Sequence, residues 1–402
     1  MYLIFNTWMK PAALFIVWLG FFTPIQAQKI ELAQDAEVSV LTCSKGDDLY
    51  NTFGHSGIRI KDPANQLDIV FNYGMFSFGG SSWQDQAAFG FEFARGKLNY
   101  WLGVQEFPNF MYSYQKQERW VYEQVLNISQ QEKQDLFNAL LINYEPENRA
   151  YQYDFFFDNC SSRVRDMLVN SIGPMFGDAD SPIHEKTDKS FIDLINPYIV
   201  GKPWLDLGMD ILLGVHSSRK ASHYEFMFLP YHLMNQIAAV EGLVASEQMI
   251  ITAPDRPIGE ANFSFLSPFS VFTYLLIFIG AITYRNWKQG KHFFVIDRIL
   301  FVITGLLGTL FLAMWLFTDH LAAHINLNMF WAFPLNLVAV FFLKNPKWEV
   351  YFRIAAGFCG FVLLGWFISP QQYHIAILPL TAIMLIRHIK CLSYHHKLTT
   401  LN

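Results

Sequence analysis

The sequence is poor in charged residues and in cysteine, and it has no surplus of positive charge. Only 16% of its 402 residues are charged, and the formal net charge is −5. Without a basic surplus the chain lacks the electrostatic footprint of a nucleic-acid-binding protein, so no nucleic acid is expected as a partner. Its hydrophobic share of 52% and mean hydropathy of +0.20 are too high for an ordinary soluble enzyme and too low for a wholly lipid-embedded chain. These values predict one soluble domain joined to one membrane domain.

The N-terminus has the pattern of a secretory signal. An apolar stretch over residues 11–22 follows Lys10 and precedes the small residue Ala27. Ile25 is bulky where a small residue is preferred for cleavage, so an uncleaved anchor helix is the alternative. We therefore expect residues 1–27 to be a signal peptide or a signal anchor, and in either case the following domain is exported.

Long apolar runs are confined to the last third of the chain. We expect about five transmembrane helices, at residues 268–284, 293–317, 327–343, 353–368 and 373–387, the last interrupted by Pro379. The connections near 285–291 and 344–353 and the tail carry Lys and Arg, whereas the loops at 318–328 and 369–372 carry none. By the positive-inside rule the tail is cytoplasmic and residues 28–262 face the periplasm. This predicts a multi-pass protein of the inner membrane, with a membrane domain over residues 263–402. Asp297 and Arg298 near the end of the second span are expected to reach the interface, without an assigned function.

The exported domain has α+β patterning. Alternation of apolar and polar residues predicts strands over residues 36–44, 55–62 and 67–74, with a turn joining the last two into a hairpin. Helical spacing is present over residues 129–145. A second helix is expected to begin just after Asn159, with Asp158 or Asn159 as its N-cap.

Cysteine is scarce enough that each one can be interpreted. Cys359 lies in a predicted span and Cys391 in the predicted cytoplasmic tail, so only Cys43 and Cys160 share the exported domain. An oxidising compartment allows a disulfide between them. The alternative is that Cys160 is a nucleophile, because the start of a helix and a nearby arginine such as Arg163 or Arg165 favour the thiolate.

A nucleophile needs a base, and His55 is the candidate. It begins a predicted strand directly after Gly54, where glycine permits close approach of the backbone. The hairpin brings Asn72 or Tyr73 roughly opposite His55, and a polar side chain there can fix the imidazole tautomer. Asn72 is the expected orienting residue, with Asp68 as the substitute if the register differs.

Further polar residues are expected around the substrate or the oxyanion. Amides and side chains at the helix start are suited to this role, and so are several residues of the exported hairpin and of the outer loop at 319–328. This set comprises Asn159, Ser161, Arg163, Tyr73, His320, Asn326 and Asn328. His320 and His324 have the spacing of one helical face, but a structural or headgroup-contacting role is favoured over a metal, and no metal or cofactor is predicted.

The residues also resemble a known family. The stretches LTCSKGDDLYNTFGHSGIRIKDP, FNYGMFSF, DFFFDNCSSRVRDML and TDHLAAHINLNMFWAFPLNL are similar to those of the Lnb-like lipoprotein N-acyltransferases of Bacteroidota. More distantly, a histidine on a strand before a cysteine on a helix resembles the circularly permuted papain-like fold of the lecithin–retinol acyltransferase and NlpC groups. Permuted acyltransferases often carry a second histidine on the neighbouring strand, and residues 67–74 contain none.

The resemblance implies a catalytic Cys160, its partner His55, and acyl transfer through a thioester. The implied acceptor is the α-amine of a diacylglyceryl lipoprotein, and the implied donor is an acyl chain of a phospholipid or of the lipoprotein itself, both held in the lipid bilayer. Two other functions remain open. One is a membrane-tethered NlpC-type cell-wall cysteine peptidase that uses the same two residues. The other is a non-catalytic sensor or assembly protein with a Cys43–Cys160 disulfide.

Overall fold

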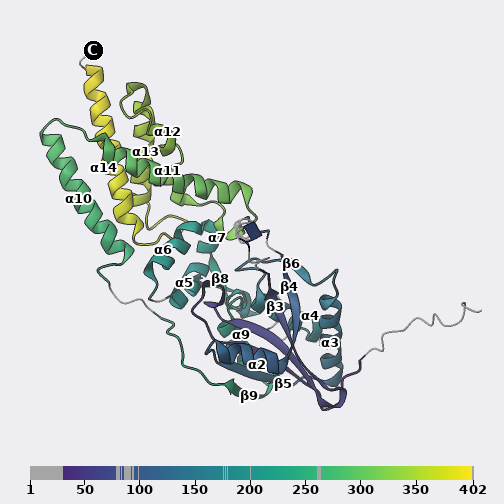
Figure 1. Ribbon diagram of the computed structural model, residues 1–402. Helices are drawn as coiled ribbons and strands as arrows, with labels where there is room; N and C mark the ends of the chain where they lie inside the picture. Colours follow the sequence, from purple (N-terminus) through teal and green to yellow (C-terminus); the bar gives the residue numbers. More distant parts are fainter. Residues whose placement is uncertain are drawn as a thin grey trace, which may run out of the picture.

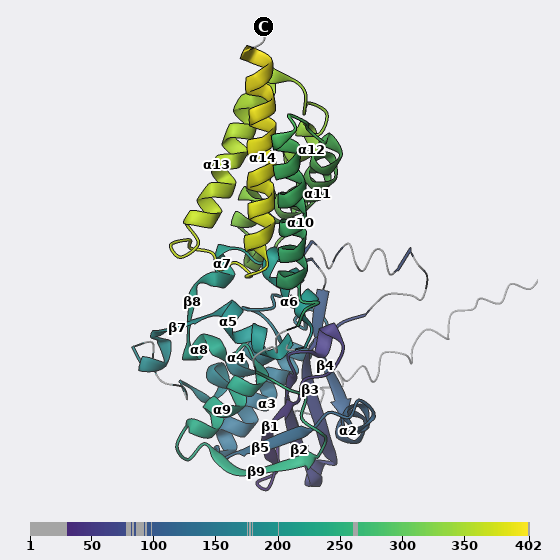
Figure 2. The same cartoon turned by 90° about the vertical axis from the view of Figure 1, so that its left-hand side faces the viewer.

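A sheet domain and a helical bundle make up the computed structural model, with the bundle stacked on one end of the sheet domain (Figure 1). The residues described are 30–77, 82, 84–85, 92, 95–97, 99–174, 176, 178, 180–199, 201–259 and 264–400. The predicted signal segment at residues 1–27 lies outside them. The C-terminus lies at the end of the bundle far from the sheet (Figures 1 and 2).

An antiparallel sheet forms the centre of the first domain. Its strands are β1 (Glu37–Cys43), β2 (His55–Asp62), β3 (Leu67–Met75), β4 (Asn99–Glu106), β5 (Val121–Leu126), β6 (Ala150–Gln152) and β9 (Val244–Ile251). Among the described residues, seven strands pair in the order β6-β4-β3-β2-β1-β5-β9. The three predicted strands and their hairpin are confirmed as β1, β2 and β3.

Both faces of the sheet are covered (Figure 2). One face packs on α3 (Gln130–Tyr144), α4 (Cys160–Ile172) and α9 (Pro230–Ala239), and the other packs on α2 (Phe107–Lys116). Alternate residues of one strand serve the two layers, since Val40 packs toward α4 and Leu41 packs toward α2. A capping box of Ser129 and Glu132 begins α3 within the predicted helical segment.

A smaller helical layer lies between the sheet domain and the bundle. It contains α5 (Phe191–Ile195), α6 (Pro203–Leu212), α7 (Val215–Ser218) and α8 (His223–Phe226), with a short ladder of β7 (Lys186–Ser190) and β8 (Lys220–Ser222). Aromatic rings fill its core, where Phe156 packs against Phe191 and Phe228. The apolar run before Cys160 is therefore part of this core.

The bundle contains α10 (Pro268–Lys288), α11 (Phe294–Phe317), α12 (Asn336–Ala339), α13 (Glu349–Leu364) and α14 (Ile377–Thr400). Within the described residues, three helices are long and apolar enough to cross a membrane, at Pro268–Lys288, Phe294–Phe317 and Ile377–His396. Five spans were predicted. The segment 327–343 is instead broken into a 3-10 turn (Leu327–Phe330) and the short α12.

Prolines and buried polar side chains account for the break in segment 327–343 and for the unbroken last helix, which was expected to be interrupted at Pro379. Pro334 stands in the break, and a proline disrupts the hydrogen bonding of a helix. The buried Asn336 side chain bonds Thr304 Oγ1 at 2.9 Å and Tyr351 at 2.5 Å, so this segment anchors the bundle interior. Pro379 falls in the first turn of α14, where a missing N–H has no intrahelical acceptor to lose, and the helix continues past residue 387.

Hydrogen bonds join the two domains at loop 369–376 and at the loop after α11. Asn326 and Asn328 donate to the carbonyl of Ile211 in α6, at 2.8 and 3.2 Å. Gln372 donates to Asp193 at 2.8 Å, and Gln371 donates to the carbonyl of Leu213 at 3.2 Å. The helical layer, and with it the sheet domain, is thus fixed to the bundle through partly buried polar contacts.

Candidate active site

Cys160 is the first residue of α4, as the sequence predicted. Asn159 is the N-cap, and its Oδ1 accepts from the amides of Ser161 and Ser162 at 2.9 Å each. The Asn159 amide donates to the carbonyls of Phe155 and Phe228, at 2.7 and 2.9 Å. Every polar atom of the Asn159 side chain is hydrogen-bonded within the protein, so Asn159 positions the turn that carries Cys160.

The first turn of α4 is attached to the strand that begins with His55. Ser161 Oγ lies 2.7 Å from Ser56 Oγ, and both side chains are fully buried. Gly74, at the end of β3, lies against the thiol-bearing residue, because a Cβ at Gly74 would be 3.7 Å from Cys160 Cβ. Cys160 therefore lies at the ends of β2 and β3.

His55 is held by the orienting residue that the sequence suggested. Its Nε2 lies 3.2 Å from Asn72 Oδ1, and Asn72 is buried. Asn72 pairs directly with Gly57, two residues beyond His55 on the same face of the sheet. A Cβ at Gly57 would approach Asn72 Oδ1 to 3.2 Å, so glycine leaves room for the amide to reach the imidazole. Asp68, the substitute, instead binds Arg59 at 2.7 and 2.8 Å.

This contact defines the chemistry of the imidazole. Because Asn72 Oδ1 accepts, Nε2 of His55 carries the proton and Nδ1 is left as a base. Burial lowers the pKa of His55 to about 4, so the ring is neutral at physiological pH. Within the described part of the chain, His55 and the Cys160 thiol share no hydrogen bond.

The thiol is subject to opposing influences. Burial raises the pKa of Cys160 above its ordinary value, whereas the amides of Ser56, Ser161 and Cys160 itself lower it. The charge of Arg119 lowers it further. The resting state is therefore a neutral thiol near a neutral imidazole, with backbone amides already directed at the sulfur.

The positive charge near the thiol comes from a residue that the sequence analysis missed. Arg163, expected to favour the thiolate, forms a two-point ion pair with Asp158, and Arg165 binds Asp166 at 2.7 Å. Arg119 is 3% exposed, donates to the carbonyl of Ser44 at 2.6 Å, and among the described residues pairs with no carboxylate. It precedes β5 in a stretch without a motif, so only the sheet order could have placed it beside β1.

The remaining predicted site residues differ in whether they lie near Cys160. Tyr73 faces the α3 side, and its hydroxyl donates to Asn143 Oδ1 at 2.6 Å. His320 lies near the turn before Cys160, because it acts on the pKa of Asp154 in that turn. Burial raises this pKa, and the amides of Phe157 and Phe156 and then the interaction with His320 lower it. Asn326 and Asn328 are fully buried in the contact with α6 described above.

Cys43 lies on β1, directly opposite His55 on β2. Burial raises its pKa to about 12, and its thiol has a hydrogen bond with Tyr114. Cys43 and Cys160 are both free cysteines in this structure.

Two other groups of side chains have the composition of a metal site. Among the described residues these are Asp206, Asp210 and His374, between α6 and loop 369–376, and His292, Asp297 and Cys391 in the bundle. Burial and, to a smaller extent, the charge of nearby Asp206 raise the pKa of Asp210 to about 7.

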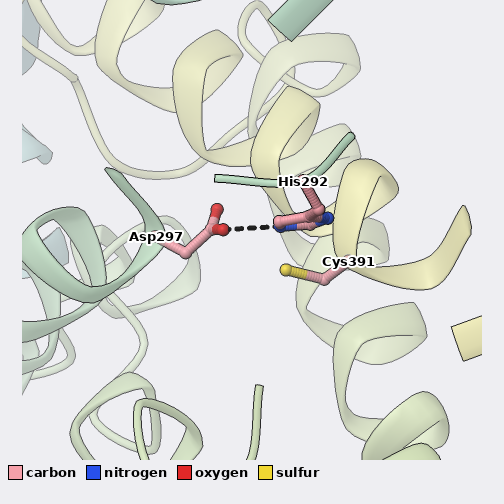
Figure 3. Close-up of side chains that lie close together, drawn as sticks. All are labelled: His292, Asp297 and Cys391. Atoms are coloured by element: carbon pink, nitrogen blue, oxygen red, sulfur yellow. Dashed lines mark hydrogen bonds and ion pairs between the residues drawn. The ribbon is translucent and has the colours of Figure 1, made fainter. Parts of the chain in front are cut away.

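In the second group, His292 and Asp297 are hydrogen-bonded and Cys391 lies beside them (Figure 3). His292 Nε2 lies 2.7 Å from Asp297 Oδ2, and Arg387 binds both carboxylate oxygens at 2.7 and 2.9 Å. The expectation that Asp297 reaches the interface is therefore wrong, because it is fully buried and neutralised by Arg387.

Comparison with known proteins supplies the family. Residues 26–188 match the model of the Lnb N-terminal periplasmic domain, and residues 260–398 match that of the Lnb transmembrane domain. No curated protein and no solved structure matches the chain. The two matches follow one another in the order of the two structural regions and cover most of the sequence, including His55, Asn72 and Cys160. The chain therefore belongs to the Lnb family of lipoprotein N-acyltransferases.

Proposed function

We propose that this membrane protein transfers an acyl chain from a lipid to the α-amine of the lipidated N-terminal cysteine of a lipoprotein, through a thioester on Cys160. The observation that carries the proposal is the placement of Cys160 at a capped helix start beside His55 and Asn72. Family membership supports a membrane-bound, lipoprotein-modifying enzyme with a periplasmic domain. The strand-borne histidine before a helix-borne cysteine supports a circularly permuted papain-like fold.

In the first half-reaction, Nδ1 of His55 removes the thiol proton and the sulfur attacks the ester carbonyl. Backbone amides at the start of α4 stabilise the oxyanion, since they lie at the sulfur already. The carbon–oxygen bond then breaks, and the imidazolium returns its proton to the departing alcohol. The product is a thioester on Cys160 and a lipid with one acyl chain fewer.

In the second half-reaction the lipoprotein amine attacks the thioester. A carbon–nitrogen bond forms, the carbon–sulfur bond breaks, and His55 takes the proton that the amine loses. Delivery of that proton to the sulfur restores the thiol. Asn72 acts throughout by holding the ring so that Nδ1, not Nε2, is the basic atom.

The bundle accounts for the choice of substrates. Donor and acceptor chains are both embedded in the bilayer, so a catalytic domain fixed to membrane helices meets them at high effective concentration. We place the protein in the inner membrane as a multi-pass protein, with the sheet domain in the periplasm and the C-terminus, at the opposite end of the bundle, in the cytoplasm.

The test is mass spectrometry of lipoprotein N-termini from cells with the gene, without it, and with the Cys160→Ser variant. We expect N-acylated termini only with the intact gene. Unchanged N-acylation on deletion, in a strain without a redundant enzyme, would overturn the proposal.

Two alternative functions predict other experimental outcomes. A cell-wall peptidase would cleave muropeptides when the purified full-length protein is supplied with them, and it would leave lipoprotein termini unchanged. A non-catalytic, disulfide-bonded protein would show a quantitative Cys43–Cys160 bridge. The free thiols favour the enzyme over that last alternative.

A further inference from the structure

A buried hydroxyl near Cys160 has no hydrogen-bond partner among the described residues. Tyr151 lies on the edge strand β6, paired with Tyr100 of β4, and its side chain is 8% exposed. Its hydroxyl oxygen is shielded from solvent and forms no hydrogen bond within the described part of the chain. Buried polar groups in folded proteins are nearly always hydrogen-bonded, so an orphan in a packed core is expected where function requires it.

The hydroxyl and the nucleophile flank one position. A Cβ at Gly74 would lie 3.7 Å from Cys160 Cβ and 3.8 Å from the Tyr151 hydroxyl oxygen. Gly74 has φ of +85°, a conformation that other residues rarely adopt. Cys160 and the Tyr151 hydroxyl therefore both border the position that a side chain at Gly74 would occupy.

The ring is held rigidly. The Arg163 guanidinium lies 4.1 Å from the ring centroid of Tyr151, and the ring of Tyr73 meets it edge-on at 6.3 Å. Arg163 is itself fixed by Asp158. A donor that is fixed before the reaction needs no reorganisation when charge develops.

Electrostatics keep the hydroxyl protonated. Burial raises the pKa of Tyr151 far above its ordinary value, and negative charge on Cys160 raises it further. The phenol therefore cannot act as a base near neutral pH, and it remains a neutral hydrogen-bond donor.

We propose that Tyr151 donates a hydrogen bond to the oxyanion that forms on the acyl carbonyl during attack by Cys160, opposite the amides of the α4 start. This rests on the proposed function. The acceptor is the carbonyl oxygen of an acyl ester in the first step and of the thioester in the second. No proton is transferred, so Tyr151 acts only by stabilising charge.

The test compares Tyr151→Phe with Tyr100→Phe in the full-length protein. Tyr100 is the cross-strand neighbour of Tyr151 and has the same 8% exposure, so its variant controls for loss of a hydroxyl from this core. The substrate is a diacylglyceryl lipopeptide in phospholipid mixed micelles, which supplies both possible donors. We expect Tyr151→Phe to lower kcat by about 10²–10³-fold with KM little changed, and Tyr100→Phe to stay near the parent.

A second readout separates charge stabilisation from damage to the site. Alkylation of Cys160 by iodoacetamide requires the thiolate but forms no oxyanion, so its rate should be unchanged in Tyr151→Phe. A normal kcat in Tyr151→Phe, or an equal fall in alkylation and acylation, would overturn the assignment. Full activity of Cys160→Ser would instead overturn the proposed function.

Discussion

Each region of the molecule contains a cysteine, a histidine and a third polar residue near one another, but the surroundings of the two sets differ. The exported trio is Cys160, His55 and Asn72, and the membrane trio is Cys391, His292 and Asp297. Cys160 begins a helix with amides directed at its sulfur, whereas Cys391 lies inside α14 and is fully buried. Side-chain types alone therefore do not define a catalytic site, since the backbone supplies the rest.

The third residues differ in the same sense. Asn72 is neutral and serves one partner, the imidazole. Asp297 is charged, and Arg387 occupies both of its oxygens. In the membrane trio, Arg387 neutralises the Asp297 carboxylate. His292 therefore stabilises this ion pair and does not act as a base.

The sharpest test of this comparison exchanges the two sulfurs for oxygen one at a time. We expect Cys160→Ser to abolish N-acylation, a loss of at least about 10³-fold, because a serine hydroxyl is far less acidic than a thiol. Cys391→Ser should retain activity near that of the parent. The measurement is the rate of N-acyl lipopeptide formation in mixed micelles. Comparable losses from both variants would end the distinction between the trios.

Removing one partner of the buried ion pair should affect stability and not chemistry. Asp297→Asn leaves the Arg387 guanidinium without its counter-charge, and breaking a buried pair in this way costs about 3–5 kcal/mol. Thermal unfolding of the detergent-solubilised protein measures the loss. Asp206→Asn is a suitable control, because Asp206 is partly exposed and its ion pair is with His374 rather than with a buried arginine. A stable Asp297→Asn protein that is inactive would assign the membrane trio a chemical role.

A smaller effect is expected at the orienting residue. Asn72→Ala frees the imidazole to adopt the wrong tautomer, and we expect kcat to fall by about 10-fold to 10²-fold, less than for Cys160→Ser. Asn72→Asp should recover part of that loss, because a carboxylate also accepts from Nε2. No recovery by the acid would indicate that Asn72 is needed for packing against Gly57 instead.

The pH dependence of thiol alkylation should show the weakest signal. The pKa of Cys160 is raised and that of His55 is lowered to about 4, so the alkylation rate should climb through neutral pH with no step near pH 6.5. Arg119→Gln should slow alkylation a few-fold at pH 7 by raising the thiol pKa. Arg165→Gln should change the alkylation rate less, because Arg165 is already paired with Asp166. A clear step near pH 6.5 would show that His55 is charged at rest.

Local patterns predicted much of the exported site. Alternation marked the hairpin, and an asparagine before a polar helical run marked the N-cap, since each depends on neighbours in the sequence. Arg119 and Tyr151 could not be found this way. Arg119 precedes β5 and Tyr151 lies on β6. Both strands join the sheet through partners far along the chain, and no local signal encodes that order.

The bundle was harder to predict because hydropathy reports how apolar a segment is and not whether its helix is unbroken. Residues 327–343 are apolar enough to suggest a span, yet Pro334 breaks the backbone and Asn336 bonds neighbouring helices. Arg387 counts among the positive charges of the predicted cytoplasmic tail, but it is buried and forms an ion pair with Asp297. The role of a polar residue within an apolar run depends on its partners on other helices, which the local sequence does not reveal.

The contacts of Ile211, Asp193 and Leu213 with the bundle fix the position of the sheet domain relative to the membrane helices. With the sheet domain locked to the membrane helices, the height of Cys160 above the bilayer is set by the fold and does not adjust to the substrate. Under the proposed function, a lipid or lipoprotein substrate must bring its carbonyl or amine to that height. Depth in the membrane thereby becomes a criterion of selection, alongside shape and charge.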